Sequence, residues 1–410
     1  MSEILKISNF LCIKNAEVHI RKINVIIGPQ SSGKSVCAKL LFFFKTTFYD
    51  LMNNWNKFMN LEDFEIYQYK KFVDYFPFEY WNNSKFEIEY QYGSFHFKIT
   101  RKSSRSNKLY FEYTKEIEDI FLKIDKKRKG FSFESDPSLI KSVIFEEVSK
   151  IFKSDEHLTK FQLYSPAERN LIPMMSTVFP SVSSINSIFS EYLRFYNDIK
   201  NEIYILEKEF HMKFQHLEAF NKIILPILGG KIIVENGRDY ISTDARKIII
   251  SSASSGQQTF YTLGVILKAL LFGKLKIDNG CTLYVEEPES HLFPDAQERV
   301  LKALMFFSKK SVNKNQLFIT THSPYILSLM NNFLQAGHMV ESGVNKKKIG
   351  SIINEDFAIK PTEFSAYSIQ DGVLRNIIDS ETLLINAVII DNTANNINND
   401  FDNLLNLMKP

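Results

Sequence analysis

A glycine-rich segment at residues 28–35 has the composition and spacing of a phosphate-binding loop. It fits the pattern G-x-x-x-x-G-K-[ST] without a mismatch, and it follows an apolar run at residues 23–27 that predicts a buried strand. The residues after Ser35 predict a helix. In that context the backbone N–H groups and the helix dipole attract an anion. Lys34 would reach the β- and γ-phosphates, and the Ser35 hydroxyl would ligate Mg²⁺.

The whole loop is expected to contact a nucleoside triphosphate. Its members are Gly28, Pro29, Gln30, Ser31, Ser32, Gly33, Lys34 and Ser35. The alternative is a chance match in a loop rich in serine and glycine. The strand before the loop and the helix after it argue against chance, because phosphate-binding loops require both.

Two adjacent carboxylates follow a later apolar run. Residues 282–285 predict a buried strand, and Glu286 and Glu287 come directly after it. We expect Glu286 to hold the metal, directly or through water, and Glu287 to orient and deprotonate the attacking water. Neighbouring strand residues point to opposite faces, which separates the two roles. A solvated acidic turn is the alternative, and it is disfavoured directly after apolar residues.

Two further segments are candidates for the same site. His322 follows the predicted strand 316–319, where an imidazole can hydrogen-bond a γ-phosphate. A Ser/Gly turn precedes the apolar helix predicted at 260–271, and its candidate nucleotide-binding residues are Ser254, Ser255, Gly256 and Gln257. N–H groups and hydroxyls at a helix start can bind an anion, although such turns are also ordinary helix caps.

Bulk composition is that of an ordinary globular protein. Of the 410 residues, 44% are hydrophobic and 24% are charged, and a net charge of +3 neither demands nor excludes nucleic acid. The three cysteines lie far apart, which argues against a disulfide framework or a zinc site. The first residues do not form a signal peptide, and the apolar cluster at 40–44 is too short to span a bilayer. We therefore expect a cytoplasmic protein.

The positioning elements predict an α/β fold with an interrupted ATPase core. The core is expected at 1–50, 161–183 and 229–345, followed by a strand and helix extension at 346–410. An inserted α+β unit at 51–160 is expected to have its own small core. Residues 184–228 show the heptad spacing of a coiled-coil arm, with a long helix packed on the domain as the alternative.

Basic residues form two clusters in the insertion. They are Arg101, Lys102, Arg105 and Lys108, then Lys126, Lys127, Arg128 and Lys129. Such clusters can track nucleic-acid phosphates, but they are more often solvated loops. Residues 161–170 predict a strand that runs into a turn at Pro166, and Arg169 there could reach a phosphate or form an ion pair with Glu168.

The ordered motifs together resemble the ABC-type ATPase family in its SMC/OLD-like branch. Residues 28–35 match Walker A, 253–257 look like the signature motif, 283–287 resemble Walker B with the catalytic glutamate, and His322 matches the switch histidine. Residues 286–294, 321–324 and 164–169 look like the "AAA ATPase" families around the overcoming-lysogenization-defect proteins. Departures from the pattern are Ala253 and Ser255 in the signature, Glu286 in place of aspartate, and Phe293 at the D-loop aspartate position.

The resemblance implies an ATP- and Mg²⁺-dependent homodimer in which each P-loop pairs with the partner's signature. Overcoming-lysogenization-defect proteins also carry a TOPRIM nuclease domain, and about 88 residues after His322 are too few for one. The expected role is therefore a sensor or regulatory subunit of an anti-phage defence complex of the Septu, PARIS or retron-associated type, with a separately encoded effector. The alternatives are a RecF/SMC-type repair ATPase that clamps DNA itself and a transporter nucleotide-binding subunit.

Overall fold

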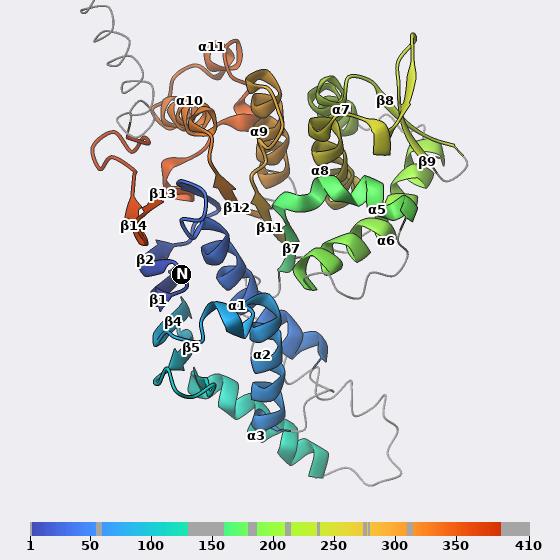
Figure 1. Ribbon diagram of the computed structural model, residues 1–410. Coiled ribbons are helices and arrows are strands. Elements are labelled where there is room, and N and C mark those ends of the chain that lie inside the picture. Colours follow the sequence, from blue (N-terminus) through green and yellow to red (C-terminus); the bar gives the residue numbers. More distant parts are fainter. Residues whose placement is uncertain are drawn as a thin grey trace, which may run out of the picture.

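The computed structural model shows a mixed α/β fold with one large sheet and flanking helices (Figure 1). The residues that it describes are 2–54, 60–129, 160–178, 187–209, 215–235, 238–273, 277, 279–309 and 315–386. Among the helices of this described part, none is long and apolar enough to cross a membrane.

Eleven of the described strands form the large sheet. In spatial order they are β6 (Tyr110–Tyr113), β5 (Phe95–Arg101), β4 (Phe86–Tyr92), β1 (Glu3–Phe10), β2 (Ile13–His19), β14 (Val373–Asn376), β13 (Phe364–Gln370), β3 (Ile23–Ile27), β12 (Gln316–Thr321), β11 (Cys281–Glu286) and β7 (Phe161–Ser165). The half from β13 to β7 is parallel, and the half from β6 to β2 is antiparallel. The predicted strands at the motifs are confirmed.

The register of the parallel half gathers the motifs at one edge. Thr321 of β12 lies opposite Ile27 of β3, and Glu286 of β11 lies opposite Thr320. The loops after these strands therefore leave the sheet side by side, although hundreds of residues separate them in the sequence. Ligands bind at such carboxyl ends in open α/β sheets.

Helices cover the two faces of this parallel half. Helix α1 (Lys34–Asn54) packs on one face, while α8 (Ser255–Phe272), α9 (Pro294–Lys309) and α10 (Pro324–Glu341) pack on the other. Side chains of β11 alternate between the two cores, because successive strand residues point to opposite faces. Tyr284 lies in the core with α1, and Leu283 and Val285 lie in the core with α8 and α9.

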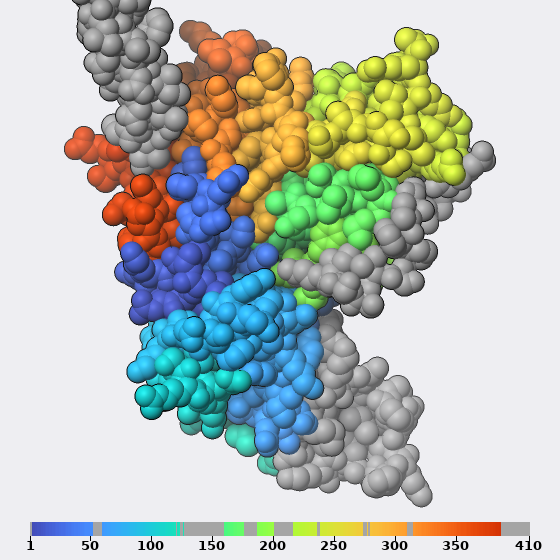
Figure 2. All heavy atoms as spheres, viewed as in Figure 1, coloured from blue at the N-terminus to red at the C-terminus, as the bar shows by residue number. Residues whose placement is uncertain are grey.

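The insertion extends the sheet. It contains α2 (Leu61–Tyr75), the short η2 (Phe78–Tyr80), strands β4 to β6 and α3 (Lys115–Lys129). The expectation of a separate core was wrong, because β4 pairs with β1 and aromatic rings of α1 and the insertion share one cluster. This unit forms the lower part of the molecule, in light blue and cyan (Figure 2). The helix predicted at 138–153 lies outside the described residues.

The region with heptad spacing contains two helices, α6 (Ser187–Glu209) and α7 (Gln215–Leu228). Their apolar positions pack against α8 and α9, so the described part follows the alternative of helices packed on the domain. A three-stranded sheet then follows, of β8 (Lys231–Glu235), β9 (Arg238–Ser242) and β10 (Lys247–Ile249).

Short helices complete the chain. They are η3 (Ala167–Leu171), α5 (Ile172–Val178), η4 (Ile250–Ser252), α11 (Lys346–Gly350), η5 (Glu355–Phe357) and η6 (Pro361–Glu363). Strand β13 confirms the strand expected at 364–369. The terminal helix predicted within 391–410 lies outside the described residues.

Candidate nucleotide-binding site

The glycine-rich loop has a backbone that its residue types explain. A Cβ atom on Gly28 would lie 2.4 Å from the carbonyl oxygen of Ile369, and Gly33 has a φ of +109°. Neither position tolerates another residue without a shift of the backbone. Ser31 also lies in the left-handed region, with a φ of 57°. The loop connects β3 to α1, as predicted.

Lys34 lies at the centre of a chain of polar groups. Its Nζ atom donates to the carbonyl oxygens of Gly28 and Pro29 at 2.9 and 2.7 Å, and it lies 3.4 Å from Nδ1 of His322. On the other side of that imidazole, Nε2 lies 3.0 Å from Oε1 of Glu287. Burial lowers the pKa of Lys34, and the charges of nearby carboxylates oppose this shift. The structure thus brings together three predicted site residues that follow three different strands, β3, β11 and β12.

A cavity of about 860 Å³, the P-loop cavity, opens beside this group. Its described lining comprises Leu11, Cys12, Gln30, Ser31, Ser32, Gly33, Lys34, Ser35, Val36, Tyr80, Glu287 and His322. The volume is in the range of known ligand sites. A second hollow, of about 550 Å³, shares Gln30, Glu287 and His322 and continues along residues 289–294.

Glu287 has an unusual backbone. Its φ of 43° lies in the left-handed region, which non-glycine residues seldom adopt. Its N–H donates to the carbonyl oxygen of Thr320 at 2.9 Å, and its Oε2 accepts from the Ser290 hydroxyl at 3.0 Å. Such conformations occur at functional sites, where surrounding contacts hold them in place. The carboxylate lines the cavity and is 35% exposed.

Glu286 is buried and points to the face that carries α1. Oε1 accepts from the Tyr164 hydroxyl, and Oε2 accepts from the backbone N–H of Ala167 at 3.3 Å. The phenol of Tyr164 is itself buried, and both burial and the charge of Glu286 raise its pKa. The expected separation of the two carboxylates is therefore present: Glu287 faces the cavity, and Glu286 is held by donors from the end of β7.

Arg169 has neither of the two expected roles. It is fully buried, and its guanidinium donates to the backbone oxygens of Pro166, Glu286 and Glu287 at 2.6 to 2.9 Å. The residue therefore fixes the backbone that carries the two carboxylates. A buried guanidinium whose two terminal nitrogens donate to carbonyl groups cannot be recognised from local sequence, because two of these partners are more than 115 residues away.

Glu289 was not among the predicted site residues. Its Oε1 accepts from the Thr321 hydroxyl at 2.6 Å and from the His322 N–H at 2.8 Å, so it positions the histidine. Its other oxygen is buried without a hydrogen-bond partner in the described structure. The sequence feature that could have indicated it is its position two residues after Glu287, as a third acid in the same segment.

Comparison with known families gives the chain its classification. Residues 23–328 match the family described as "AAA domain, putative AbiEii toxin, Type IV TA system". The match covers more than half of the chain. The protein belongs to this AAA family. No curated protein matches it.

Solved structures with some similarity to this AAA protein include two SMC head domains and a recombination mediator. The SMC head domain from Thermotoga maritima is 12% identical, with a TM-score of 0.36 and coverage of 92% of this chain and 98% of that one. An SMC head from Pyrococcus furiosus is 14% identical, with a TM-score of 0.37 and coverage of 92% and 95%. RecF is 11% identical, with a TM-score of 0.35 and coverage of 92% and 98%. Similarities of this size do not establish a shared activity.

The signature-like residues of the AAA protein form the start of α8. Ser254 caps the helix: its hydroxyl accepts from the N–H of Gln257, whose side chain accepts in return from the N–H of Ser254. Gln257 also donates to the carbonyl of Leu228. A Cβ on Gly256 would lie 2.5 Å from the carbonyl oxygen of His291. None of residues 254–257 belongs to the described lining of the P-loop cavity.

The basic clusters of the AAA protein differ from expectation at one residue. Arg101 is 1% exposed and donates to the carbonyl oxygens of Trp81, Asn82, Ser84, Ser104 and Ser106, so it cannot contact nucleic acid. The expectation for this residue was wrong, because its charge stabilises a turn. Lys102 and Lys108 lie over the ring of Tyr110, and Arg105 and Lys126 are exposed. The side chains of 127–129 lie outside the described part.

Proposed function

We propose that this protein is an ABC-type ATPase that binds and hydrolyses Mg·ATP. The observation that carries the proposal is the chain of contacts from Lys34 through His322 to Glu287 on the wall of the P-loop cavity. It joins a phosphate-binding lysine to a carboxylate base, and these are the groups that phosphoryl transfer to water needs.

Each residue has a defined part in that reaction. The loop N–H groups and Lys34 would bind the phosphates, and His322 would hydrogen-bond the γ-phosphate. Glu287 would orient the attacking water and accept its proton. Ser35 lines the cavity and would ligate a magnesium ion directly, whereas Glu286 lies outside the described lining and accepts from Tyr164 and Ala167, so it would act on the ion through water. When bound, the ion would supply charge neutralisation at the phosphate oxygens.

The insertion supplies a side chain for the base. Tyr80, at the end of η2, is 70% exposed yet lines the P-loop cavity together with Leu11. Purine rings stack on aromatic side chains. We therefore place the base of the nucleotide against Tyr80, beyond the phosphate end of the site.

A second copy of the chain would complete the site. Residues 254–257 are absent from the described cavity lining, and Phe293, which is 78% exposed, lines the adjoining hollow that shares Glu287 and His322 with the cavity. An exposed phenyl ring next to a phosphate site fits a protein contact. The proposal is that two protomers enclose two nucleotides, with the α8 start of each facing the P-loop of the other.

The biological role in the proposal is regulatory. The family description names a putative AbiEii toxin of a Type IV TA system. We propose that this ATPase is the sensor subunit of an anti-phage defence complex with a separately encoded effector. A RecF- or SMC-like repair role is the second candidate, favoured by the exposed Lys102 and Lys108 around Tyr110. Stimulation of ATP hydrolysis by duplex DNA alone would select the second candidate.

Two substitutions test the ATPase. Lys34→Ala should weaken ATP binding by about 10- to 100-fold, the value of a charge-assisted hydrogen bond. Glu287→Gln should retain binding and lower the turnover rate by about 100-fold or more. Lys39→Ala, on the same helix but outside the described cavity lining, is the matched control. Equilibrium binding of a fluorescent ATP analogue and phosphate release measure the two effects. Full turnover in Glu287→Gln would contradict the proposal.

A further inference from the structure

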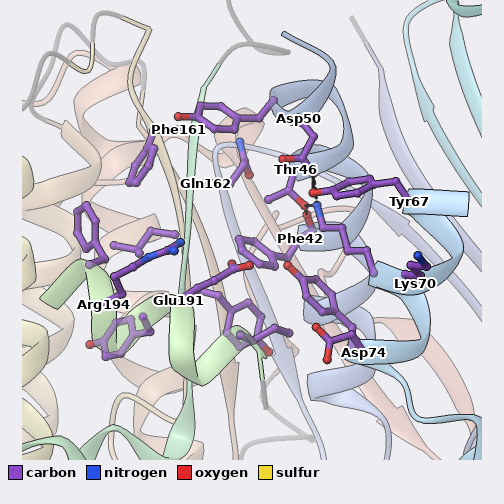
Figure 3. Close-up of a pocket in the computed structure, with 18 of the residues that line it drawn as sticks. Phe42, Thr46, Asp50, Tyr67, Lys70, Asp74, Phe161, Gln162, Glu191 and Arg194 are labelled. Atoms are coloured by element: carbon purple, nitrogen blue, oxygen red, sulfur yellow. Dashed lines mark hydrogen bonds and ion pairs between the residues drawn. The ribbon is translucent and has the colours of Figure 1, made fainter. Parts of the chain in front are cut away.

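A larger cavity of about 1150 Å³, the aromatic cavity, lies between the insertion and the far edge of the sheet (Figure 3). Helices α1 and α2 form one wall, and β7 and α6 form the other. β7 is the last strand in the order of the described sheet on this side, and its residues 161–164 line the cavity. An edge strand of this kind offers main-chain groups to another extended segment.

The described walls combine aromatic rings with four carboxylates and three cations. Phe42, Tyr75, Phe161 and Tyr192 are among the aromatic lining residues. Of the lining charges, those of Asp50 and Lys71 compensate each other, since Lys71 Nζ lies 2.5 Å from Asp50 Oδ2 and also donates to Thr46.

The remaining lining charges are the carboxylates of Asp74, Glu191 and Asp198 and the cations Lys70 and Arg194. Glu191 and Arg194 reach in from α6, while Lys70 lies at the margin on α2 (Figure 3). Aromatic faces beside carboxylates are the chemistry that recognises an organic cation.

One buried polar group in the wall lacks a partner. Tyr75 is 4% exposed and lines the cavity, and its hydroxyl forms no hydrogen bond within the described structure. Leaving such a group unpaired costs free energy, which a ligand with a hydrogen-bonding atom would recover. This hydroxyl is an observation independent of the charges.

The aromatic cavity adjoins side chains that contact the proposed nucleotide site. Tyr164 lines it and donates its hydroxyl to the carboxylate of Glu286. The ring of Phe42, on the helix that begins with Lys34, lies 5.4 Å from the ring of Tyr164 and 5.9 Å from that of Tyr75. A ligand in the cavity would therefore contact both the P-loop helix and the residue that holds Glu286.

We propose that this cavity binds an extended peptide segment of a partner protein through an arginine or lysine side chain, and that Tyr164 couples its occupancy to Glu286. The volume exceeds that of most small-ligand sites, and the edge of β7 suits a peptide backbone. The coupling half rests on the proposed ATPase, whereas binding itself does not.

Calorimetry on the full chain without nucleotide tests the binding. The probe is a blocked pentapeptide with a central arginine flanked by valines, compared with its glutamine counterpart and with agmatine. The arginine peptide should bind at least tenfold more tightly than either. Equal affinity for the glutamine peptide, or no binding, would overturn the proposal. Binding of agmatine as tight as that of the peptide would overturn the peptide assignment in favour of a small cation.

Variants locate the site. The double substitution Asp74→Asn with Glu191→Gln should weaken the arginine peptide at least tenfold. Glu62→Gln, on the exposed start of α2 and outside the described lining, is the matched control and should leave the affinity unchanged. Equal peptide affinity in the double variant and the control would exclude this cavity.

Coupling is measured as the change in peptide affinity on adding Mg·ATP, in a Glu287→Gln background that preserves the nucleotide. The change should be at least threefold. Tyr164→Phe, which keeps the ring in the cavity wall but removes the hydroxyl that donates to Glu286, should abolish the change when its affinities with and without Mg·ATP are compared within that variant. An unaltered change in Tyr164→Phe, or none in the parent, would overturn the coupling. Failure of ATP to bind would refute the proposed ATPase and the coupling, while the nucleotide-free titration would still decide the peptide site.

Discussion

At the scale of residues, the candidate site residues are held in position by neighbouring side chains that have no proposed part in the reaction. His322 is positioned by Glu289, and the backbone of the two carboxylates is fixed by Arg169. The left-handed conformation of Glu287 directs its carboxylate towards the histidine. A small shift of any of these contacts would misplace the proposed base, since catalysis depends on geometry to within about an ångström.

A residue-scale prediction concerns the nucleotide base. Tyr80→Ala should weaken ATP binding by about tenfold, because base stacking on an aromatic ring contributes roughly 1–3 kcal/mol. Binding of inorganic triphosphate should be unchanged, since the loop that binds it is intact. Tyr80→Phe retains the ring and serves as the control. Isothermal titration measures both ligands, and an equal loss for ATP and triphosphate would show that Tyr80 does not contact the base.

The sequence indicated the candidate site residues that the structure brings together, but not the residues that hold them in place. Residues 28–35 follow a pattern that depends on local backbone, and Glu287 and His322 follow strands whose apolar composition is visible in the chain. Arg169 and Glu289 act through tertiary contacts that no spacing encodes. Arg101 shows the reverse error, because a basic run gave no sign that one member is buried among carbonyl groups.

At the scale of elements, the insertion joins the rest of the fold where β4 pairs with β1 in the antiparallel half of the sheet. The insertion was expected to fold around its own core. Instead, its strand β4 pairs with β1, and the aromatic residues of the insertion pack on α1. Alternating apolar and polar residues predict that a strand exists, yet not which strand it pairs with. Because tertiary packing decides which strands pair, the number of strands in the sheet could not be predicted from the sequence.

An element-scale prediction concerns Lys160, which is buried next to the start of β7. Burial lowers its pKa to about 7, with Lys45 acting in the same direction. The unfolded chain therefore binds more protons than the folded one between about pH 7 and pH 10, and stability rises with pH in that window. Lys160→Met should remove a slope of up to about 1.4 kcal/mol per pH unit.

Denaturant unfolding between pH 7 and pH 9 measures this slope. Lys14→Met replaces an exposed lysine and should leave the pH dependence of the wild-type chain unchanged. An identical slope in the Lys160→Met variant would show that Lys160 keeps an ordinary pKa in the folded protein.

At the scale of the whole molecule, two cavities are lined by successive parts of α1, residues 34–36 in the P-loop cavity and residues 42–50 in the larger one. The P-loop cavity contains the proposed catalytic groups, and the aromatic cavity lies between α2 and α6. Tyr164 and α1 connect them. This arrangement would allow a bound partner segment to influence the Mg·ATP site without entering it, as the sensor role in the proposal requires.

The central claim is that two copies of the chain complete one another's nucleotide sites, and sedimentation velocity tests it most directly. With Mg·ATP, Glu287→Gln should sediment at about twice the mass of the 47.7 kDa chain. Adding Ser254→Arg should return it to a monomer that still binds ATP, because the bulky cation blocks the α8 start. Ser254→Asn, which retains a helix-capping side chain, should remain dimeric. An ATP-bound Glu287→Gln protein that stays monomeric, or a Ser254→Arg variant that still dimerises, would contradict the account.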